Sequence, residues 1–333
     1  MSQLVTIFGG SGFVGRYITR RMAKQGWRVK VAVRKPNEAL FVKPYGVVGQ
    51  VEPIFCNVRD DVSVNLALKG ADAVINCVGI LSEIGKNRFH SVQSQGAERI
   101  ARMASAEGAK YFTQISAIGV DEAADSNYSR SKALGEKAVL KYFPDAVILR
   151  PSVIFGPEDQ FFNRFAAMAR NSPFLPVIGA NTKFQPVYVD DVAKAAELAV
   201  KGEAQAGIYE LGGPDVASFR ELMMLMLHVI RRNSIILPIP FFAGHIMALG
   251  FDTLQTLSLG IIKNGIVTRD QIKNLCRDNI VSSHYKSFND LGITPTTLDT
   301  VLPNYLWCYR PSGQFAAIKE SAKNLRSGQD PRT

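Results

Sequence analysis

Residues 4–15 read Leu4-Val5-Thr6-Ile7-Phe8-Gly9-Gly10-Ser11-Gly12-Phe13-Val14-Gly15, an apolar strand followed at once by a glycine-rich turn and the start of a helix. Gly9 permits a tight turn, Gly12 permits a pyrophosphate to approach the backbone, and Gly15 permits close packing of the helix on the sheet. The free N–H groups at the start of such a helix can hold the anion. Glycine spacing alone is weak evidence, but the strand before it and the amphipathic pattern after it favour dinucleotide binding over a purely structural unit.

The residues that follow the second expected strand, 28–33, distinguish the two nicotinamide dinucleotides. An NAD site usually places an acidic residue here for the ribose 2′-hydroxyl, whereas this chain has Arg34-Lys35. A carboxylate would repel a 2′-phosphate, while a guanidinium can pair with it through two hydrogen bonds and stack on the adenine. The sequence therefore predicts NADP(H) rather than NAD(H). The alternative is that Arg34 and Lys35 are solvated charges at a strand end.

Composition limits the class of protein. The 333 residues, 47% of them hydrophobic, suffice for one large domain with an appended lobe or for two domains. The four cysteines are far apart and two of them sit in apolar strands, which is typical of reduced, buried thiols. The four histidines show no metal-ligand spacing, so we predict no metal. We expect no signal peptide, transit peptide or transmembrane span, because the first strand starts almost at residue 1 and the most apolar window, 234–251, contains prolines and glycines.

The net charge of +10 is concentrated near the amino terminus, where residues 1–51 contain nine Lys or Arg and one acidic residue. Part of this charge would serve the cofactor phosphates. The remainder either forms a solvated helix face or docks an acidic partner or anionic lipid, and it comprises Arg16, Arg20, Arg21, Lys24 and Arg28. We do not expect nucleic acid as a partner, because no aromatic residues are interleaved to stack on bases.

Apolar strand-like runs alternate with amphipathic helix-like runs over the first half of the chain. The strands are expected near 4–8, 28–33, 51–58, 72–78, 111–116 and 146–154. This alternation predicts an α/β fold with a doubly wound parallel sheet, the Rossmann arrangement. We expect a dinucleotide-binding domain over 1–156, to which 184–212 add late strands and a helix. Residues 157–183 and 213–320 would form a smaller, mainly helical C-terminal lobe, and 321–333 a polar tail.

A candidate catalytic group follows the fifth strand. Ser116 stands at the strand end, and Tyr128 and Lys132 lie four residues apart on one face of the next helix. A phenol ionises near about 10 in water, so it needs a nearby cation to act at neutral pH. Lys132 could stabilise the phenolate and hold the nicotinamide ribose, while Ser116 would bind a substrate carbonyl and Tyr128 would transfer a proton. These roles apply only if the protein turns over a substrate.

These motifs resemble the extended short-chain dehydrogenase/reductase superfamily. The likeness rests on the glycine turn, Asn57-Val58-Arg59-Asp60, Ser116, Tyr128 with Lys132, and the run 149–157, LRPSVIFGP. The second half is similar to a narrower family, the nucleotide-binding accessory subunits of respiratory complex I. That similarity is carried by 268–273 (TRDQIK), 277–282 (RDNIVS), 291–295 (LGITP) and 302–311 (LPNYLWCYRP).

The resemblance implies a protein that holds NADPH tightly and docks on the peripheral arm of the complex, near the membrane and the quinone entrance. Its partners would be other peripheral-arm subunits and anionic lipid at the membrane surface, and its place the cytoplasmic side of a bacterial inner membrane. Asn57 replaces the superfamily's usual aspartate near the adenine, and Asn76-Cys77-Val78-Gly79 replaces the more familiar Asn-x-Ala-Gly. The cofactor-binding residues implied are Gly9, Ser11, Gly12, Phe13, Val14, Gly15, Arg34, Lys35, Asn57, Val58, Cys77, Val78, Gly79, Tyr128, Lys132 and Pro151.

Two other functions stay open. One is a soluble NADP-dependent reductase or epimerase, and the other is a redox-sensing module that reads the NADPH/NADP ratio. The apolar run 238–262 would wall a substrate pocket in an enzyme, face lipid or a subunit in an accessory protein, or simply form the core of a helical lobe. Lys263 and the segment 269–273 next to it would suit an anionic headgroup zone.

Overall fold

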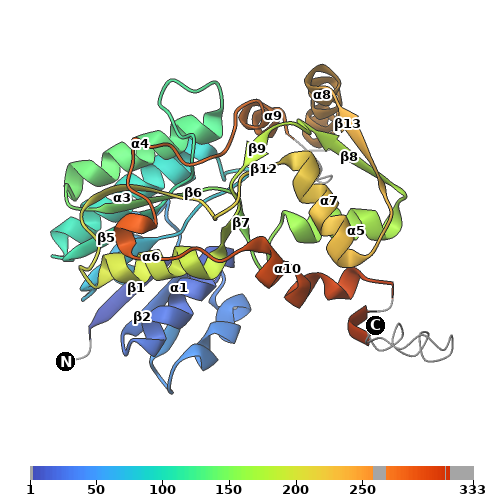
Figure 1. Ribbon diagram of the computed structural model, residues 1–333. Coiled ribbons are helices and arrows are strands. Elements are labelled where there is room, and N and C mark those ends of the chain that lie inside the picture. Colours follow the sequence, from blue (N-terminus) through green and yellow to red (C-terminus); the bar gives the residue numbers. More distant parts are fainter. Residues whose placement is uncertain (1–2, 258–267, 312, 316–333) are drawn as a thin grey trace.

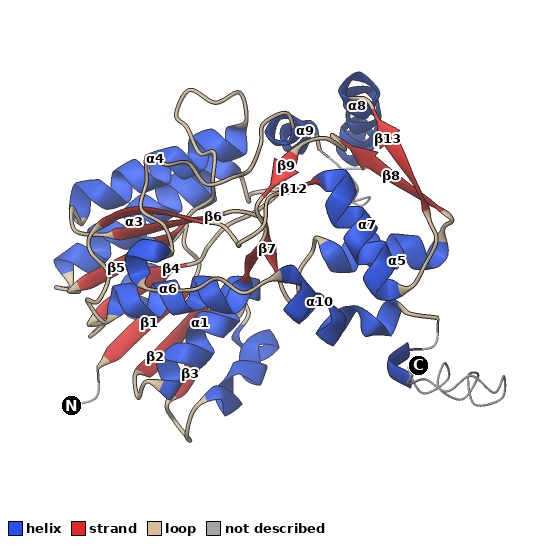
Figure 2. Cartoon of the chain, in the orientation of Figure 1, coloured by secondary structure: helices blue, strands red, loops and turns tan. Residues whose placement is uncertain are grey.

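The computed structural model describes residues 3–257, 268–311 and 313–315 (Figure 1). The end of the apolar run, Lys263 and the polar tail 321–333 lie outside the described residues. The described chain forms a large α/β layer structure, with a second group of helices and short strands beside it (Figure 2).

The large part is built on a seven-stranded sheet in which every pairing is parallel. Its order is β11-β6-β5-β4-β1-β2-β3, so the chain starts in the middle and winds outward in both directions. This confirms the predicted doubly wound fold. The strands are β1 (Leu4–Phe8), β2 (Arg28–Val33), β3 (Val51–Phe55), β4 (Ala73–Asn76), β5 (Tyr111–Ile115), β6 (Val147–Pro151) and β11 (Gly207–Leu211).

Two helical layers bury the two faces of this sheet. α1 (Phe13–Lys24) and α6 (Val189–Val200) share one core with it, and α2 (Asp61–Leu68), α3 (Gln95–Ala106) and α4 (Asn127–Tyr142) share the other. Because both faces are covered, the central strands are continuously apolar, as in β1, where all five residues are buried. The pattern of apolar residues in α1 has the matching helical period: Ile18 and Met22, one turn apart, are fully buried.

The sheet strands end earlier than the sequence predicts. β3 ends at Phe55 rather than at residue 58, and β4 and β6 end at Asn76 and Pro151. The first residue past each end still donates a backbone hydrogen bond to the neighbouring strand, and the regular pairing stops there: Cys56 donates to Val33, Cys77 to Phe8 and Ser152 to Leu211. Apolar character alone therefore overestimates strand length at these three ends.

The second part has its own core, rich in aromatic side chains. Phe161 stacks on Phe219 with ring centroids 5.4 Å apart, and Phe184 packs edge-on against Phe219. Its strands are β7 (Ile154–Phe155), β8 (Phe174–Ile178), β9 (Lys183–Phe184), β10 (Val187–Tyr188), β12 (Ala217–Ser218) and β13 (Ile235–Ile239). Its helices are α5 (Phe162–Asn171), α7 (Phe219–Ile230), α8 (Phe241–Leu257), α9 (Arg269–Leu275) and α10 (Leu298–Leu306).

A late segment returns from this second part to the edge of the large sheet. The Lys286 carbonyl accepts from the Glu210 N–H at 2.8 Å, and the Lys286 N–H donates to the Ile208 carbonyl. The segment therefore lies beside β11. Phe288 and Ile293 are buried in the core of the sheet. The segment thereby covers an edge strand that would otherwise expose unpaired backbone groups. The expected lobe 213–320 thus contains residues that pack with the Rossmann sheet, and the exact domain boundaries stay a prediction.

Candidate cofactor-binding site

The predicted site residues meet at the carboxyl edge of the sheet. The glycine turn follows β1, Arg34 follows β2, Asn57 follows β3, Cys77 follows β4, Ser116 follows β5, and Pro151 is the last residue of β6. In an open doubly wound sheet the ligand crevice lies where the strand order reverses, which here is between β1 and β4. The topology therefore brings together residues from six separate stretches of the chain.

The glycine turn leaves the start of α1 open to an anion. Gly9 has φ +75° and its N–H donates to Ala32 across the sheet at 2.9 Å. A Cβ on Gly15 would lie 2.3 Å from the Gly9 carbonyl oxygen, so only glycine permits this close approach of helix and turn. The N-cap, Gly12, supplies no side-chain hydrogen bond, and the first turn carries no acidic residue. The N–H groups at this helix end are thus free to bind a pyrophosphate.

Arg16 supports the turn, although the sequence analysis placed it among surface charges. Its guanidinium donates to the carbonyls of Ser11 and Gly12, both at 3.3 Å, and pairs with Glu158 at 3.3 Å. Arg21 of the same helix pairs with Asp190 and Glu197. These two cations are therefore engaged within the molecule and are not available to an acidic partner. The only signal for Arg16 in the sequence is its position directly after Gly15.

The two basic residues after β2 differ in their surroundings. Both are exposed, but the Lys35 ammonium lies 2.7 Å from the Glu38 carboxylate. Arg34 makes no ion pair with the residues that the structure describes. Arg34 is therefore the cation at this strand end that could meet a ligand anion. The preference for NADP(H) over NAD(H) stays a prediction.

Two amide side chains, half-buried Asn57 and buried Asn76, hold the turns after β3 and β4. Asn57 accepts from the backbone N–H and the side chain of Arg59, at 3.2 and 3.3 Å. Asn76, fully inside the molecule, accepts from the Val78 N–H at 3.0 Å and donates to Gln114. This bond shapes the turn 77–79 and brings Gly79 against Lys132, where an added Cβ would lie 3.4 Å from Nζ. Burial raises the pKa of the Cys77 thiol to about 12, so this cysteine stays protonated.

Ser116, Tyr128 and Lys132 gather at the same edge. The Ser116 hydroxyl is buried and has no hydrogen-bond partner within the described residues. Such an orphaned group is costly unless a ligand satisfies it. Lys132 donates to the Ile115 carbonyl at 3.0 Å, and burial lowers its pKa to about 8.

The Tyr128 phenol keeps its proton at neutral pH. Burial first, and then the Asp270 carboxylate, raise its pKa to about 12. The lowering by Lys132 that the sequence predicts is absent from this arrangement. Tyr128 can therefore act as a hydrogen-bond or proton donor, but not readily as a base. The catalytic roles of the three residues stay a prediction.

Taken together, the edge fits a nicotinamide dinucleotide. An uncapped helix end suits the pyrophosphate, an exposed guanidinium lies where the adenosine ribose would be, and an orphaned hydroxyl and a buried lysine lie on the nicotinamide side. Among the described residues no cluster of three or more His, Cys, Asp or Glu side chains is arranged to hold a metal ion.

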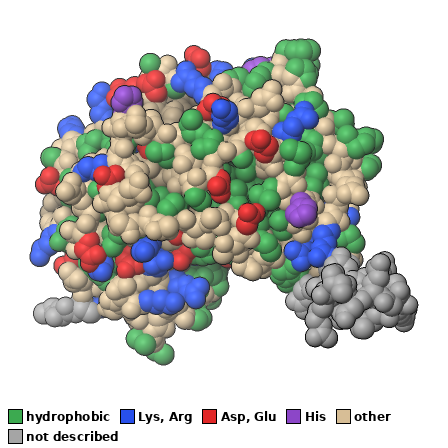
Figure 3. Space-filling view, in the orientation of Figure 1, with side chains coloured by type: hydrophobic (Ala, Val, Ile, Leu, Met, Phe, Trp, Pro, Cys, Tyr) green, Lys and Arg blue, Asp and Glu red, His purple; other side chains and the backbone are tan. Residues whose placement is uncertain are grey.

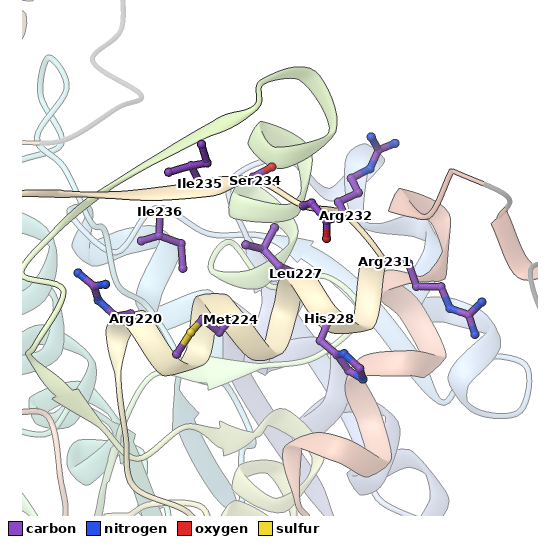
Figure 4. A pocket seen from close by; sticks show the side chains of 10 residues that line it. Arg220, Met224, Leu227, His228, Arg231, Arg232, Ser234, Ile235 and Ile236 are labelled. Carbon is purple, nitrogen blue, oxygen red and sulfur yellow. The ribbon is translucent and has the colours of Figure 1, made fainter.

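A separate groove of about 840 Å³ lies between α7 and β13 (Figure 4), and none of its lining residues belongs to the predicted cofactor site. Its lining combines cationic and apolar side chains and includes no carboxylate. Figure 3 shows hydrophobic side chains reaching the surface on this side of the molecule, along α8 and β13. The lining consists of Arg220, Met224, Leu227, His228, Arg231, Arg232, Asn233, Ser234, Ile235 and Ile236.

No helix within the described ranges combines the length and the hydropathy that crossing a bilayer requires. Exposed large apolar side chains are nevertheless frequent near the groove. They include Phe174, Ile235, Leu237, Phe242, Ile246 and Leu249.

Comparison with known proteins agrees with this geometry. Residues 5–212 match the NAD dependent epimerase/dehydratase family. A crystal structure of the Bordetella bronchiseptica enzyme WbmH in complex with NAD+ superposes with a TM-score of 0.68 at 16% identity, covering 94% of this chain and all of that one. At this identity the likeness shows the fold.

Two sequence relatives extend the comparison. "NADH dehydrogenase [ubiquinone] 1 alpha subcomplex subunit 9, mitochondrial" of Arabidopsis thaliana is 35% identical over 316 residues, covering 93% of this chain and 79% of that protein. "Ceramide reductase" of Caulobacter vibrioides is 31% identical over 239 residues, covering 71% of this chain and 74% of that protein. The first likeness includes the second part of the molecule as well as the family domain.

Proposed function

Because the chain belongs to the NAD dependent epimerase/dehydratase family, we propose that it is an NADPH-binding accessory subunit of respiratory complex I. The observation that carries the proposal is the extent of the likeness to a named subunit of that complex, which runs well beyond the family domain into the α9 and α10 region. A likeness confined to residues 5–212 would support only a nucleotide-binding fold.

In this proposal the protein's own residues hold the cofactor in three places. The open N-terminus of α1 binds the pyrophosphate, Arg34 pairs with the 2′-phosphate, and Lys132 donates to the nicotinamide ribose. NADPH, when bound, supplies a hydride donor. The half-buried Cys77 thiol stays protonated and Tyr128 keeps its proton, so neither side chain adds a negative charge beside the bound cofactor.

The second part of the molecule supplies the surface for the complex and the membrane. The groove beside α7 is lined by Arg220, Arg231 and Arg232 together with apolar side chains, and exposed apolar side chains continue from it along β13 and α8. Cations next to apolar side chains suit an anionic membrane surface. We place the protein on the peripheral arm near the quinone entrance, on the cytoplasmic side of a bacterial inner membrane.

The assembly proposal is tested by purification. Complex I is isolated from membranes in mild detergent through a tag on another subunit, and the preparation is probed for this chain and for released NADPH. Co-purification of both in near-equal amounts is expected. If the chain elutes free of the intact complex, or if the complex forms normally without it, the accessory role is wrong.

The cofactor preference is tested with Arg34→Asp. The change removes a charge-assisted pair worth about 1.5–3 kcal/mol, so NADPH affinity should fall about 10- to 100-fold while NADH affinity holds or improves. Lys35→Asp is the matched control, since Lys35 is already paired with Glu38 and should matter much less. Unchanged NADPH binding by Arg34→Asp in a titration calorimeter would refute the assignment.

A second candidate function is an NADPH-dependent carbonyl reductase. The orphaned Ser116 hydroxyl favours it, because that group could donate a hydrogen bond to a substrate carbonyl. Tyr128 would then give its proton to the carbonyl oxygen as the carbonyl carbon receives the hydride of NADPH, which yields an alcohol and NADP+. Steady NADPH oxidation with a long-chain ketone, lost in Tyr128→Phe, would support this candidate. No turnover across ketone classes by the wild type would reject it.

A further inference from the structure

The segment 268–275, which belongs to the second part of the molecule, is bonded to the first turn of α4. Asp270 of α9 accepts from the Asn127 N–H at 2.7 Å and the Tyr128 N–H at 3.2 Å, and from the Ser126 hydroxyl at 2.8 Å. α9 also contacts α8, so it bridges the apolar surface helix and the helix that carries Tyr128 and Lys132 (Figure 1).

The first turn of α9, which contains Asp270, is held by local hydrogen bonds. Thr268 and Gln271 form a reciprocal capping box, in which each side chain binds the backbone N–H of the other residue. The box fixes the first turn of α9, and Asp270 lies in that turn. Two further contacts hold α9 in place: Lys273 donates to the Asp125 carbonyl at 3.2 Å, and Asn274 lies 3.4 Å from the Ser129 hydroxyl.

The first turn of α4 depends on Asp270 for its backbone bonds. The N–H groups at a helix start have no partner within the helix. Ser126, the N-cap, satisfies only the N–H of Ser129. The bonds to Asn127 and Tyr128 come from a residue more than 140 positions away, and the negative charge also suits the positive end of the helix.

We propose that Asp270 is a positioning residue of the cofactor site, which fixes the start of α4 and thereby sets Tyr128 and Lys132 against the nicotinamide half of the cofactor. The adenosine half does not depend on it, because the glycine turn and Arg34 lie after β1 and β2. The inference rests on the proposed cofactor binding and adds that the second part of the molecule controls one half of the site.

The test compares two ligands on one variant. NADPH reaches both halves of the site, whereas adenosine 2′,5′-bisphosphate reaches only the adenosine half. Asp270→Ala should weaken NADPH binding about three- to thirty-fold, the range expected for loss of a helix cap, and should change binding of the bisphosphate less than about twofold. Both affinities are measured by titration calorimetry. If the chain prefers NADH, the pair becomes NADH and ADP.

Asp278→Ala is the matched control. Asp278 lies in the same late segment and also accepts from a backbone N–H, that of Lys183 at 2.8 Å, but it does not touch α4. It should leave the ratio of the two affinities at the wild-type value. If Asp270→Ala does not fold, Asp270→Asn, which keeps one acceptor oxygen, serves in its place and should lower NADPH affinity by a smaller factor.

The outcomes separate the two ideas. A wild type that binds no nicotinamide dinucleotide overturns the proposed function. A wild type that binds, with the same loss for both ligands in Asp270→Ala or with no loss for either, overturns only the role of Asp270. The same ratio change in Asp278→Ala would also overturn it, because the effect would then be general damage to the segment.

Discussion

Replacing Gly15 by alanine tests whether the close approach of α1 to the glycine turn creates the anion site. The new Cβ would lie 2.3 Å from the Gly9 carbonyl oxygen and 2.7 Å from the Gly10 Cα. These are backbone atoms, so no side chain can rotate away and α1 itself must shift. Overpacking of this kind costs about 1–3 kcal/mol, and we expect the upper end. Alanine returns about 1 kcal/mol in helix propensity, which leaves a net loss of about 2 kcal/mol.

Two assays measure the effect of Gly15→Ala, one on stability and one on NADPH binding. In thermal unfolding the midpoint should fall by roughly 4–8 °C, at about 2–4 °C per kcal/mol for a domain of this size. NADPH affinity should fall by on the order of tenfold or more, because a shifted helix end loses at least one charge-assisted hydrogen bond to the pyrophosphate.

Gly96→Ala is the control for this substitution. Gly96 also lies inside a helix, α3, but its Cβ would meet the Val58 side chain at 3.3 Å and would lie in ordinary contact, 3.7 Å, with the Ser91 carbonyl oxygen. The Val58 methyl can move by a few tenths of an ångström, so stability should change by less than about 1 kcal/mol. If Gly15→Ala matched Gly96→Ala in both assays, the steric account of the turn would be refuted.

Two other predictions concern buried charges. Burial lowers the pKa of Lys132 to about 8, below its ordinary value, so its ammonium is present below that pH and lost above it. The contribution of Lys132 to NADPH affinity should therefore fall between about pH 7 and 9. The affinity of Lys132→Met for NADPH should not change over this pH range in the same titrations. Arg150 pairs with Glu136 at 2.6 Å in the interior, so Arg150→Met should cost about 3–5 kcal/mol in urea unfolding, and Arg150→Met/Glu136→Met should recover much of it. A double variant no more stable than the single one would contradict the second prediction.

Local sequence patterns were sufficient to predict much of the fold. Alternating strand and helix periods in the first half predict a doubly wound parallel sheet, since only a crossover helix can join parallel neighbours. The glycine turn could be predicted because all the residues that form it lie within one short stretch of the sequence. The site residues after β1, β2, β4 and β5 could be assigned to one edge because parallel strands end on the same side.

Strand ends and side-chain partners were harder to predict. An apolar residue just past a strand end has the same sequence signature whether it stays in the strand, as expected for 56–58, or packs against the core outside the strand, as Cys56 and Val58 do. Burial first, and then the Asp270 carboxylate of α9, raise the pKa of Tyr128, and no spacing rule along the chain predicts that neighbour.

By itself the sequence determined the parallel sheet, the open helix end for an anion and the basic residues beside it, because each of these depends on periodicity or on residues within one turn of another. Only the tertiary structure decided that Arg16 pairs with Glu158, that Asp270 accepts from the first N–H groups of α4 and that 284–293 covers the β11 edge. Those contacts join residues that are tens to more than a hundred positions apart. The packing of whole helices and strands decides which residues meet in these contacts, and no local sequence pattern indicates it.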